Sequence, residues 1–226
     1  MRKAALILSV ILAVVAVLAV SGCTTYNTRG AIPILSSIEE KNFVKLEKEG
    51  IIIIAFPIAT EEDSKKYFDE NLLGYRIVGE RILAVYLDVS NKTSSAVKIT
   101  SVSLKVGEAV IPLTTAEVVY KAIKREYVGK AFLWMLPTYF VGAIPSVIHT
   151  SVINTRIEED VKSKQFVLGA EIKAAGSAQG FIWFRVPDKV VFDESKGFPK
   201  EMMLDLAIQI GKEKLARFIL AVPNPK

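Results

Sequence analysis

The chain has 226 residues, of which 51% are hydrophobic, and its formal net charge is +5 at pH 7. This length allows one substantial domain or two small ones, and the chain has no block of Lys and Arg residues of the kind typical of nucleic-acid binding. Cys23 is the only cysteine and His149 the only histidine, which excludes disulfides within the chain and zinc sites built from several histidines.

The N-terminus has the three parts of a secretory signal. Met1-Arg2-Lys3 places positive charge ahead of residues 4–20, a run of 17 residues in which Ser9 is the only polar side chain. Small residues then lead into Cys23. A basic start, an apolar stretch and a small-residue exit predict a signal-peptide helix that is removed from the mature protein.

The end of this segment, Val20-Ser21-Gly22-Cys23, resembles the lipobox of bacterial lipoproteins. The resemblance implies that a signal peptidase recognises Val20, Ser21 and Gly22, and that Cys23 carries a diacylglycerol thioether. It also implies a membrane-anchored, extracytoplasmic protein. Because Thr24 follows the cysteine, its place is the outer membrane facing the periplasm if the organism is diderm. The alternative is an uncleaved transmembrane anchor, since 17 apolar residues are near the lower limit of a spanning helix.

The rest of the chain divides into a tether and a domain. Residues 23–37 are small and polar and are broken by Gly30 and Pro33, which predicts a lipidated tether. The expected organisation is therefore a signal peptide at 1–22, the tether at 23–37 and one domain at 38–226.

Strand patterns occur in two groups along this domain. β-branched runs and period-two alternation predict strands at 51–56, 82–89, 97–106 and 109–113, and again at 166–173, 180–186, 203–210 and 215–222. Residues 39–49 fit either a short helix or a strand. The turn residues 91–95, 107–108 and 211–213 favour antiparallel connections.

Helix signals lie between the strands. Thr60, followed by three acids, predicts a helix from about residue 60 to residue 73. Thr114 and Glu117 have the spacing of a capping box, which predicts a second helix that ends or kinks at Pro137. Pro145 suits the start of a third helix, which is expected to run to about residue 164.

These elements predict a mainly β fold with an α insertion. Two groups of strands separated by a helical hairpin at about 115–164 indicate an immunoglobulin-like β-sandwich that carries the hairpin. The segments Lys66-Tyr67-Phe68, Leu87-Asp88-Val89-Ser90-Asn91 and Gly180-Phe181-Ile182-Trp183-Phe184 also resemble those of uncharacterised envelope lipoproteins with such a sandwich. This resemblance implies a non-catalytic domain on the outer side of a membrane.

One stretch inside the hairpin has no formal charge. It runs from residue 131 to residue 155 and includes Trp134, Tyr139 and Phe140. Three interpretations stay open: the stretch packs on the sandwich, spans a membrane, or places these three aromatic residues at a hairpin tip that faces the membrane.

The sequence nominates no catalytic residue, no cofactor and no metal site. His149 lies in an apolar context, which favours a structural role. The acidic runs 61–63 and 158–160 lack the ligand spacing of a calcium loop and suit a first helical turn and a solvated helix face.

Three functions remain as hypotheses. The first is a lipid-anchored, non-catalytic interaction or assembly module of the cell envelope, which binds another envelope protein and no nucleic acid. The second is a carrier that holds a lipid or another hydrophobic ligand beneath the helical hairpin. The third is an envelope hydrolase that uses a carboxylate pair.

The lipobox gives a first testable prediction. Intact-mass measurement of protein extracted from membranes is expected to show a chain that begins at Cys23 and carries the added mass of acyl chains. A mass that corresponds to unmodified Cys23 with Met1 still attached would show that the lipobox interpretation is wrong.

Overall fold

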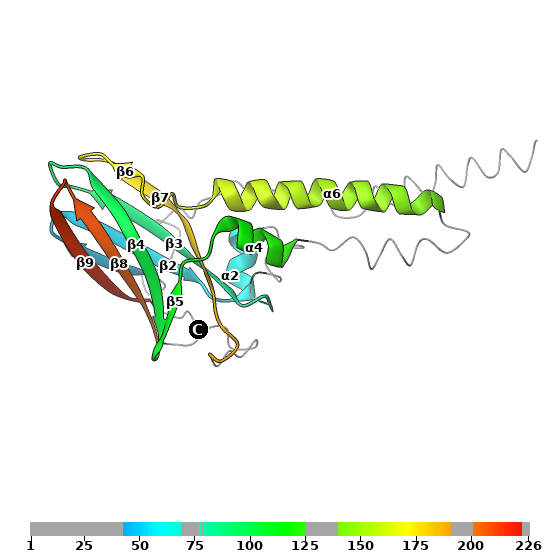
Figure 1. Ribbon diagram of the computed structural model, residues 1–226, viewed down its shortest axis with the longest axis horizontal. Coiled ribbons are helices and arrows are strands. Elements are labelled where there is room, and N and C mark those ends of the chain that lie inside the picture. Colours follow the sequence, from blue (N-terminus) through cyan, green and yellow to red (C-terminus); the bar gives the residue numbers. More distant parts are fainter. Residues whose placement is uncertain (1–42, 69–76, 78, 125–139, 191–200, 223–226) are drawn as a thin grey trace, which may run out of the picture.

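A computed structural model describes residues 43–68, 77, 79–124, 140–190 and 201–222, and for residues 61, 62 and 140–150 it describes the backbone alone. The strands form two sheets that pack face to face, and helices lie against the outer side of one sheet (Figure 1). The first sheet has the order β1-β2-β3-β7, with β1 (Val44–Lys48), β2 (Ile51–Ile58), β3 (Ile82–Asn91) and β7 (Ser177–Arg185). The second has the order β5-β4-β8-β9, with β5 (Ala109–Pro112), β4 (Val97–Val106), β8 (Met202–Ile210) and β9 (Lys214–Val222), and the short β6 (Glu171–Ile172) also pairs with β4.

This strand order is that of an immunoglobulin-like sandwich, as the sequence predicts. Strands β2, β3 and β7 take the places of strands A, B and E, and β5, β4, β8 and β9 take those of C′, C, F and G. All of these neighbours pair antiparallel. The helical insertion lies between β5 and β7, where an immunoglobulin domain has strand D.

The main core lies between the two sheets. Alternate residues of β4, β8 and β9 point inward, among them Leu104, Leu206 and Phe218, and they face Leu83 and Phe184 of the first sheet. Each such side chain contributes about 1.5–3 kcal/mol when it is fully buried. The predicted strands at 51–56, 82–89, 97–106, 109–113, 180–186, 203–210 and 215–222 are confirmed, and residues 39–49 contain strand β1.

A second core lies on the other side of the first sheet, beneath the helices. Strand β3 is therefore buried on both faces over most of its length, unlike β8 and β9. Aromatic residues fill this layer, with Phe181 and Trp183 of β7 in contact with Phe68. The helices are thus part of the folded domain, because they cover a hydrophobic sheet face that would otherwise be exposed to water.

Helix α2 (Glu61–Tyr67) begins where the sequence predicts and ends earlier. The Thr60 hydroxyl accepts a hydrogen bond from the backbone N–H of Asp63 at 3.1 Å. The expected end near residue 73 is wrong, because Phe68 has extended backbone angles and its ring is fully buried among the aromatic residues. Residues 69–76 lie outside the described residues.

Helix α4 (Ala116–Ile123) is capped by a different threonine from the one predicted. The Thr115 hydroxyl, rather than that of Thr114, accepts the hydrogen bond from the Val118 N–H at 3.4 Å. Thr114 instead bonds to β7: its N–H donates to the Trp183 carbonyl at 2.7 Å, and its hydroxyl accepts from the Arg185 N–H at 3.0 Å. The predicted end or kink at Pro137 is wrong, because α4 already ends at Ile123; Pro137 itself lies outside the described residues.

Helix α6 (Phe140–Ser163) begins before the predicted start at Pro145, and its N-terminal part projects away from the sandwich (Figure 1). Proline is expected near a helix start because the first N–H groups have no partner within the helix. Pro145 lies beyond the first turn of α6. The proline therefore predicts the approximate position of the helix start but not its first residue. Residues 153, 154, 157, 160 and 161 are buried, with the spacing of one helix face packed on the domain.

The predicted strand at 166–173 is mostly wrong. Only β6 is strand, because this segment crosses from one sheet to the other. Gln165 bridges to Phe181 of the first sheet, whereas Ile172 pairs with Val97 of the second. Gly169 lies between them with a φ of +79°, a left-handed conformation that turns the chain and interrupts the alternation.

Both ends of the insertion bind to the outer edge of β7. Thr114 precedes α4 and bonds to Trp183 and Arg185, as described above. After α6, the Phe166 N–H donates to the Phe181 carbonyl at 2.8 Å, and the Phe181 N–H donates to the Lys164 carbonyl at 2.7 Å. These bonds occupy backbone groups that an edge strand would otherwise expose.

A buried ion pair fixes the end of α6 to α2. The Lys164 ammonium lies 2.9 Å from an Asp160 carboxylate oxygen and donates to the Tyr67 carbonyl at 2.7 Å. It also lies 5.0 Å from the centre of the Phe68 ring. Burial lowers the pKa of Lys164, while Asp160 opposes that shift. Removing one member of such a pair leaves an unpaired buried charge, which is strongly unfavourable.

Asn91 joins three segments at the opposite end of the sandwich. It is 1% exposed, and its side-chain amide donates to the carbonyls of Ser95, Ile172 and Lys173 at 2.8, 3.1 and 3.0 Å. Its side-chain oxygen accepts from the N–H and hydroxyl of Thr93 at 2.9 and 2.7 Å. One side chain therefore holds the β3–β4 turn against the end of β6 and the residue that follows it.

Replacing this side chain is expected to destabilise the domain. Asn91→Ala leaves several buried backbone groups without a partner, and we expect the free energy of unfolding to fall by about 2–4 kcal/mol. Chemical denaturation of the full chain measures the change. Ser94→Ala, at an exposed position in the same turn, is the matched control and is expected to shift stability by no more than about 0.5 kcal/mol. An Asn91→Ala value as small as that of the control would contradict the role given to Asn91.

Candidate interaction face

The outer side of the second sheet is not covered by a helix among the described residues (Figure 1). We define the outer face as the outward-pointing side chains of β5, β4, β8 and β9. Its core comprises Val110, Lys105, Met203, Asp205, Arg217, Ile219 and Ala221. The alternation of buried and exposed residues along β8 and β9 generates this face, since Leu204, Leu206, Phe218 and Leu220 take the inward positions.

Large apolar side chains are exposed on the outer face. Val110 is 61% exposed, Met203 49% and Ile219 50%. The register places Val110 opposite Lys105, Lys105 opposite Met203, and Met203 opposite Ala221, in a row across four strands. Directly opposite Cβ atoms in an antiparallel sheet are about 4.5–5.5 Å apart, so the row forms a continuous surface.

An ion cluster lies beside this row. The Arg217 guanidinium donates to both carboxylate oxygens of Asp205, with Nε 2.8 Å from Oδ1, and the Lys105 ammonium lies 3.5 Å from Oδ2. The hydrogen bond from Arg217 lowers the pKa of Asp205, and the charges of Arg217 and Lys105 act in the same direction. The Asp205 side chain is only 10% exposed, whereas that of Arg217 is 63% exposed. Asp205 thus holds an exposed guanidinium in a fixed orientation on the outer face.

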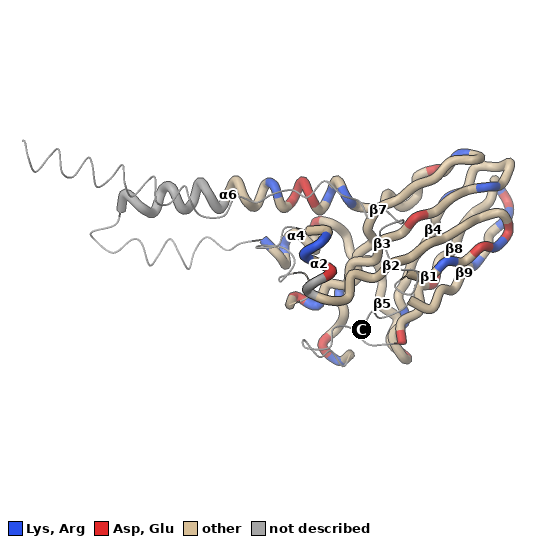
Figure 2. Tube along the Cα trace, turned by 180° about the vertical axis from the view of Figure 1, so that it is seen from behind, with Lys and Arg blue, Asp and Glu red and all other residues tan. Residues whose placement is uncertain are grey.

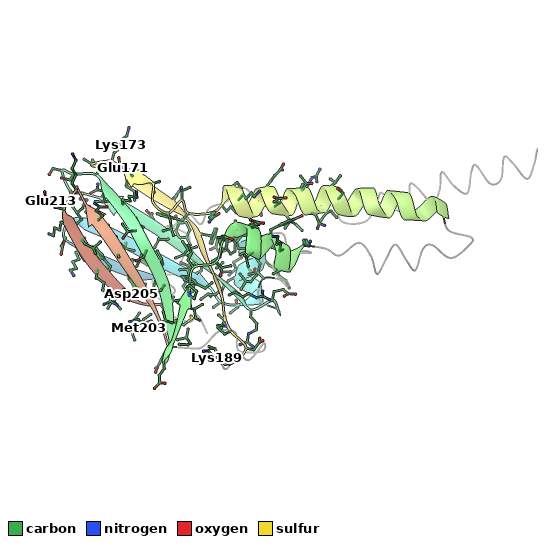
Figure 3. All side chains as sticks on the ribbon, in the orientation of Figure 1. Glu171, Lys173, Lys189, Met203, Asp205 and Glu213 are labelled. Carbon is green, nitrogen blue, oxygen red and sulfur yellow. The ribbon has the colours of Figure 1, made fainter. Side chains whose placement is uncertain are left out.

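Met203 and Asp205 lie on β8, two residues apart on the same side of the strand (Figure 3). Ile219 of β9 pairs directly with Asp205. The ion cluster and the apolar side chains therefore share one surface, which combines a fixed positive group with exposed aliphatic area. Arg and Met are enriched in the centres of protein interfaces, where fully charged surfaces are uncommon.

The free edge of β9 is partly occupied by β1. The Lys48 ammonium donates to the Arg217 carbonyl at 3.2 Å and lies 5.6 Å from the centre of the Phe218 ring. Lys214 of β9 forms an ion pair with Glu49 at 2.9 Å. A lysine placed at a strand edge hinders pairing with another strand, so the outer face rather than this edge is the accessible part of the second sheet.

The structure does not describe the side chains of the site residues predicted from the sequence. The lipobox residues Val20, Ser21, Gly22 and Cys23 lie outside the described residues, as do Trp134 and Tyr139. Phe140 is the first residue of α6, where the backbone alone is described, and His149 lies further along the same segment. Of the helices in the described ranges, none combines the length and the hydropathy that a membrane span requires.

The region expected to hold a hydrophobic ligand contains packed aromatic rings. The ring centres of Phe68 and Phe181 are 5.2 Å apart, those of Phe68 and Trp183 5.5 Å, and those of Tyr86 and Phe181 5.7 Å. Phe68, Tyr86, Phe181 and Trp183 have no exposed surface. These separations are those of direct aromatic packing.

The hydrolase hypothesis requires two carboxyl groups that face each other, and Asp88 is a carboxyl with a raised pKa. Burial raises its pKa, and burial together with the charge of Asp88 raises the pKa of Tyr86 to about 12. In the sheet, Asp88 lies between Ile54 of β2 and Gln179 of β7. Its cross-strand neighbours are thus an aliphatic residue and an amide, and a second carboxyl does not face it across either strand.

A polar hollow of about 480 Å³ lies where β3 begins and β7 ends, lined by Gly79, Glu80, Arg81, Arg185, Val186, Pro187 and Asp188. The Arg81 guanidinium donates to the carbonyls of Val186, Pro187 and Val190 at 3.2, 2.8 and 2.6 Å. These bonds hold the segment after β7, so the main role of Arg81 is structural.

The outer face was not predicted from the sequence, although a signal for it is present. In β9, Leu215, Ile219 and Ala221 point outward while Phe218 and Leu220 point inward, so the strand has apolar residues in both phases. A strand at the edge of a sheet with one buried face is expected to be polar in one phase. The apolar residues in the outward phase of β9 therefore indicate an outer surface that is more apolar than a surface in contact with water alone.

Comparisons with known proteins leave the family open. No family model matches the chain, and no curated protein matches it. Among solved structures, the chain is similar to the crystal structure of a DUF4426 family protein from Pseudomonas aeruginosa, with 9% identity and a TM-score of 0.30. The likeness covers 83% of this chain and 100% of that chain. A TM-score this low carries no functional argument, so the proposals below rest on the residues themselves.

The ion cluster predicts a pH dependence. Because Arg217 lowers the pKa of Asp205, its contribution to stability is fully present above the ordinary carboxyl pKa of 3.8 and is lost as the pH falls through the lower folded-state value. Asp205→Asn is expected to lower the free energy of unfolding at pH 7 by no more than about 1 kcal/mol. The difference from the parent protein is expected to stay constant down to about pH 5 and to shrink below the ordinary pKa of 3.8.

Denaturant unfolding of the full chain at a series of pH values measures this difference. Glu213→Gln, in the exposed β8–β9 turn, is the control and is expected to leave stability near that of the parent (Figure 3). A difference for Asp205→Asn that persists unchanged to the lowest pH would contradict the assigned role of the carboxylate.

Proposed function

We propose that this protein is a lipid-anchored, extracytoplasmic component of the bacterial cell envelope that acts as a non-catalytic interaction module and binds an envelope protein through the outer face. Cys23 is the attachment point in this proposal. In a diderm organism the place is the outer membrane, facing the periplasm. The outer face is the observation that carries the proposal.

The outer face supports an interaction role because of its composition and its rigidity. Val110, Met203 and Ile219 are each about half exposed or more and lie on β5, β8 and β9 of one sheet. Folding alone does not favour this exposure, and contiguous apolar surface rimmed by polar groups is typical of protein-binding sites. Arg217, held by Asp205, adds a directed cation that suits an acidic or carbonyl-rich partner surface.

The anchor is supported by the N-terminal sequence and by the place where the domain begins. Phe43, the first described residue, packs against the helix-side core, and the adjoining Val44 pairs with Ala55 near the end of β2. The tether therefore joins the domain at the end that carries the helices. The outer face belongs to the sheet on the far side of the sandwich (Figure 1).

The packing beneath the helices favours an interaction module over a carrier. A carrier needs an apolar space of several hundred cubic ångströms for a drug-sized ligand. The rings of Phe68, Phe181 and Trp183 pack against one another there, and all three are fully buried. We therefore place the proposed binding surface on the opposite side of the molecule.

Photocrosslinking in living cells tests the proposal. A photoreactive amino acid in place of Met203 or Ile219, in the lipidated full chain, is expected to yield one adduct of defined mass. The same adduct is expected to be lost or strongly reduced when Arg217→Glu is added, because the substitution reverses the charge that faces the partner. Mass spectrometry of the adduct identifies the partner.

The photoreactive residue in place of Val167 is the matched control, because Val167 is apolar and 69% exposed but lies outside the outer face. It is expected to give no adduct of that mass. Equal adducts from Val167 and Met203, or none from Met203 and Ile219, would overturn the proposal. An adduct with twice the mass of the chain would also overturn it, because the partner would then be a second copy.

A further inference from the structure

Helix α6 is much longer than the part of it that the domain needs. Among residues 151–163, the part of α6 whose side chains the structure describes, Ser151 and Val152 are exposed, and the buried residues Ile153, Ile157 and Val161 follow. The preceding residues, 140–152, project beyond the sandwich (Figure 1). At 1.5 Å per residue, this segment extends by about 20 Å. Helices in globular proteins normally end near the surface that they cover, so the projection needs a separate explanation.

The projecting segment has no charged residue. The sequence of residues 140–152 contains only apolar, small and hydroxyl-bearing residues together with His149, and Arg156 is the first charged residue of α6. The charged residues of α6 lie in its C-terminal half, at the base of the projection (Figure 2). Val152, the last residue of the projecting segment, is 46% exposed. An uncharged helical segment that leaves the domain surface is suited to a surface less polar than water.

The first described residue, Phe43, lies at the same end of the domain. Phe43 packs against the helix-side core, so the chain from Cys23 joins the sandwich beside the helices. Between Cys23 and Phe43 the chain has residues 24–42, which include most of the predicted tether. A flexible chain of this length has a root-mean-square span of about 24 Å and a maximum reach of about 65 Å. The chain after Cys23 therefore holds the domain at a distance from the membrane that is similar to the length by which α6 projects.

We propose that residues 140–152 of α6 dip into the interfacial region of the anchoring membrane and form a second contact beside the lipid on Cys23. This inference rests on the proposed lipid anchor. About 20 residues are needed to span a bilayer, and a helix that enters the interface without spanning it buries its apolar residues to a depth of about 5–10 Å. Contact with a second copy of the chain would also cover the uncharged segment. It would not explain why the chain from Cys23 and the projecting helix lie at the same end of the domain.

The base of α6 transmits this contact to the whole domain. Lys164 is paired with Asp160 and bonded to the Tyr67 carbonyl, and its own carbonyl accepts from β7. A helix fixed in this way holds the sandwich in one orientation once its far end is in the membrane. The outer face, on the other side of the sandwich, then stays accessible to a partner.

Fluorescence quenching at single cysteines tests the membrane contact. In the proposed protein the Cys23 thiol is blocked by lipid, so an introduced cysteine is the only free thiol in the chain. Ile144→Cys, labelled with an environment-sensitive fluorophore in the lipidated full chain, is reconstituted into phosphatidylcholine and phosphatidylglycerol vesicles that contain brominated lipids. We expect strong quenching, and more from bromines near the headgroups than from bromines near the ends of the acyl chains.

Leu215→Cys is the matched control, because Leu215 is 67% exposed on β9, beside the turn that contains Glu213 at the far end of the sandwich (Figure 3). Its label is expected to show no quenching. Vesicle flotation shows that both proteins are anchored, and intact mass shows whether Cys23 is lipidated. Anchored protein with no quenching at position 144 would overturn the membrane contact and leave the proposed function intact, whereas a free Cys23 thiol would overturn the anchor itself. Crosslinking of position 144 to a second copy without quenching would also overturn the membrane contact.

Discussion

The outer edge of β7 is the constraint on which this domain depends. In an immunoglobulin-like sandwich that edge belongs to strand D, and here the two ends of the helical insertion occupy it. Thr114 bonds to β7 just before α4, and the backbone of Lys164 and Phe166 bonds to it just after α6. The insertion is therefore anchored at both ends to one strand. Its helices must then lie over the outer side of the first sheet.

This constraint makes the two sheets unequal. The first sheet is buried on both sides where α2, α4 and α6 cover it, and Phe68 and Trp183 fill the space beneath them. The second sheet has one buried side and one outer face. The ion pair of Lys164 and Asp160 fits the same arrangement, because a buried charge pair is tolerated where further bonds to Tyr67 and the Phe68 ring compensate for the loss of water.

The sequence predicted the strands better than the helix ends or the site. Apolar and polar residues alternate over 97–106 and 203–210 because one side of each strand faces the core. This pattern is local in the sequence and can be read without the structure. The cap at Thr115 and the end of α2 at Phe68 depend on tertiary contacts, because Thr114 is taken by β7 and Phe68 by the aromatic layer. The outer face combines residues from four strands, and only the register shows that Met203 lies beside Lys105 and that Ile219 lies beside Asp205.

The geometry also relates the anchor to the outer face. A lipid tether alone lets a domain rotate freely, so a binding face spends part of its time turned toward the membrane. In the arrangement that we propose, a rigid helix based on β7 and on the Lys164 pair has its far end in the same membrane, which removes much of that freedom before a partner arrives. Orientation fixed in advance lowers the entropy that binding must remove, and affinity rises without any new contact. On this argument α6 and the outer face act together although they lie on different parts of the sandwich.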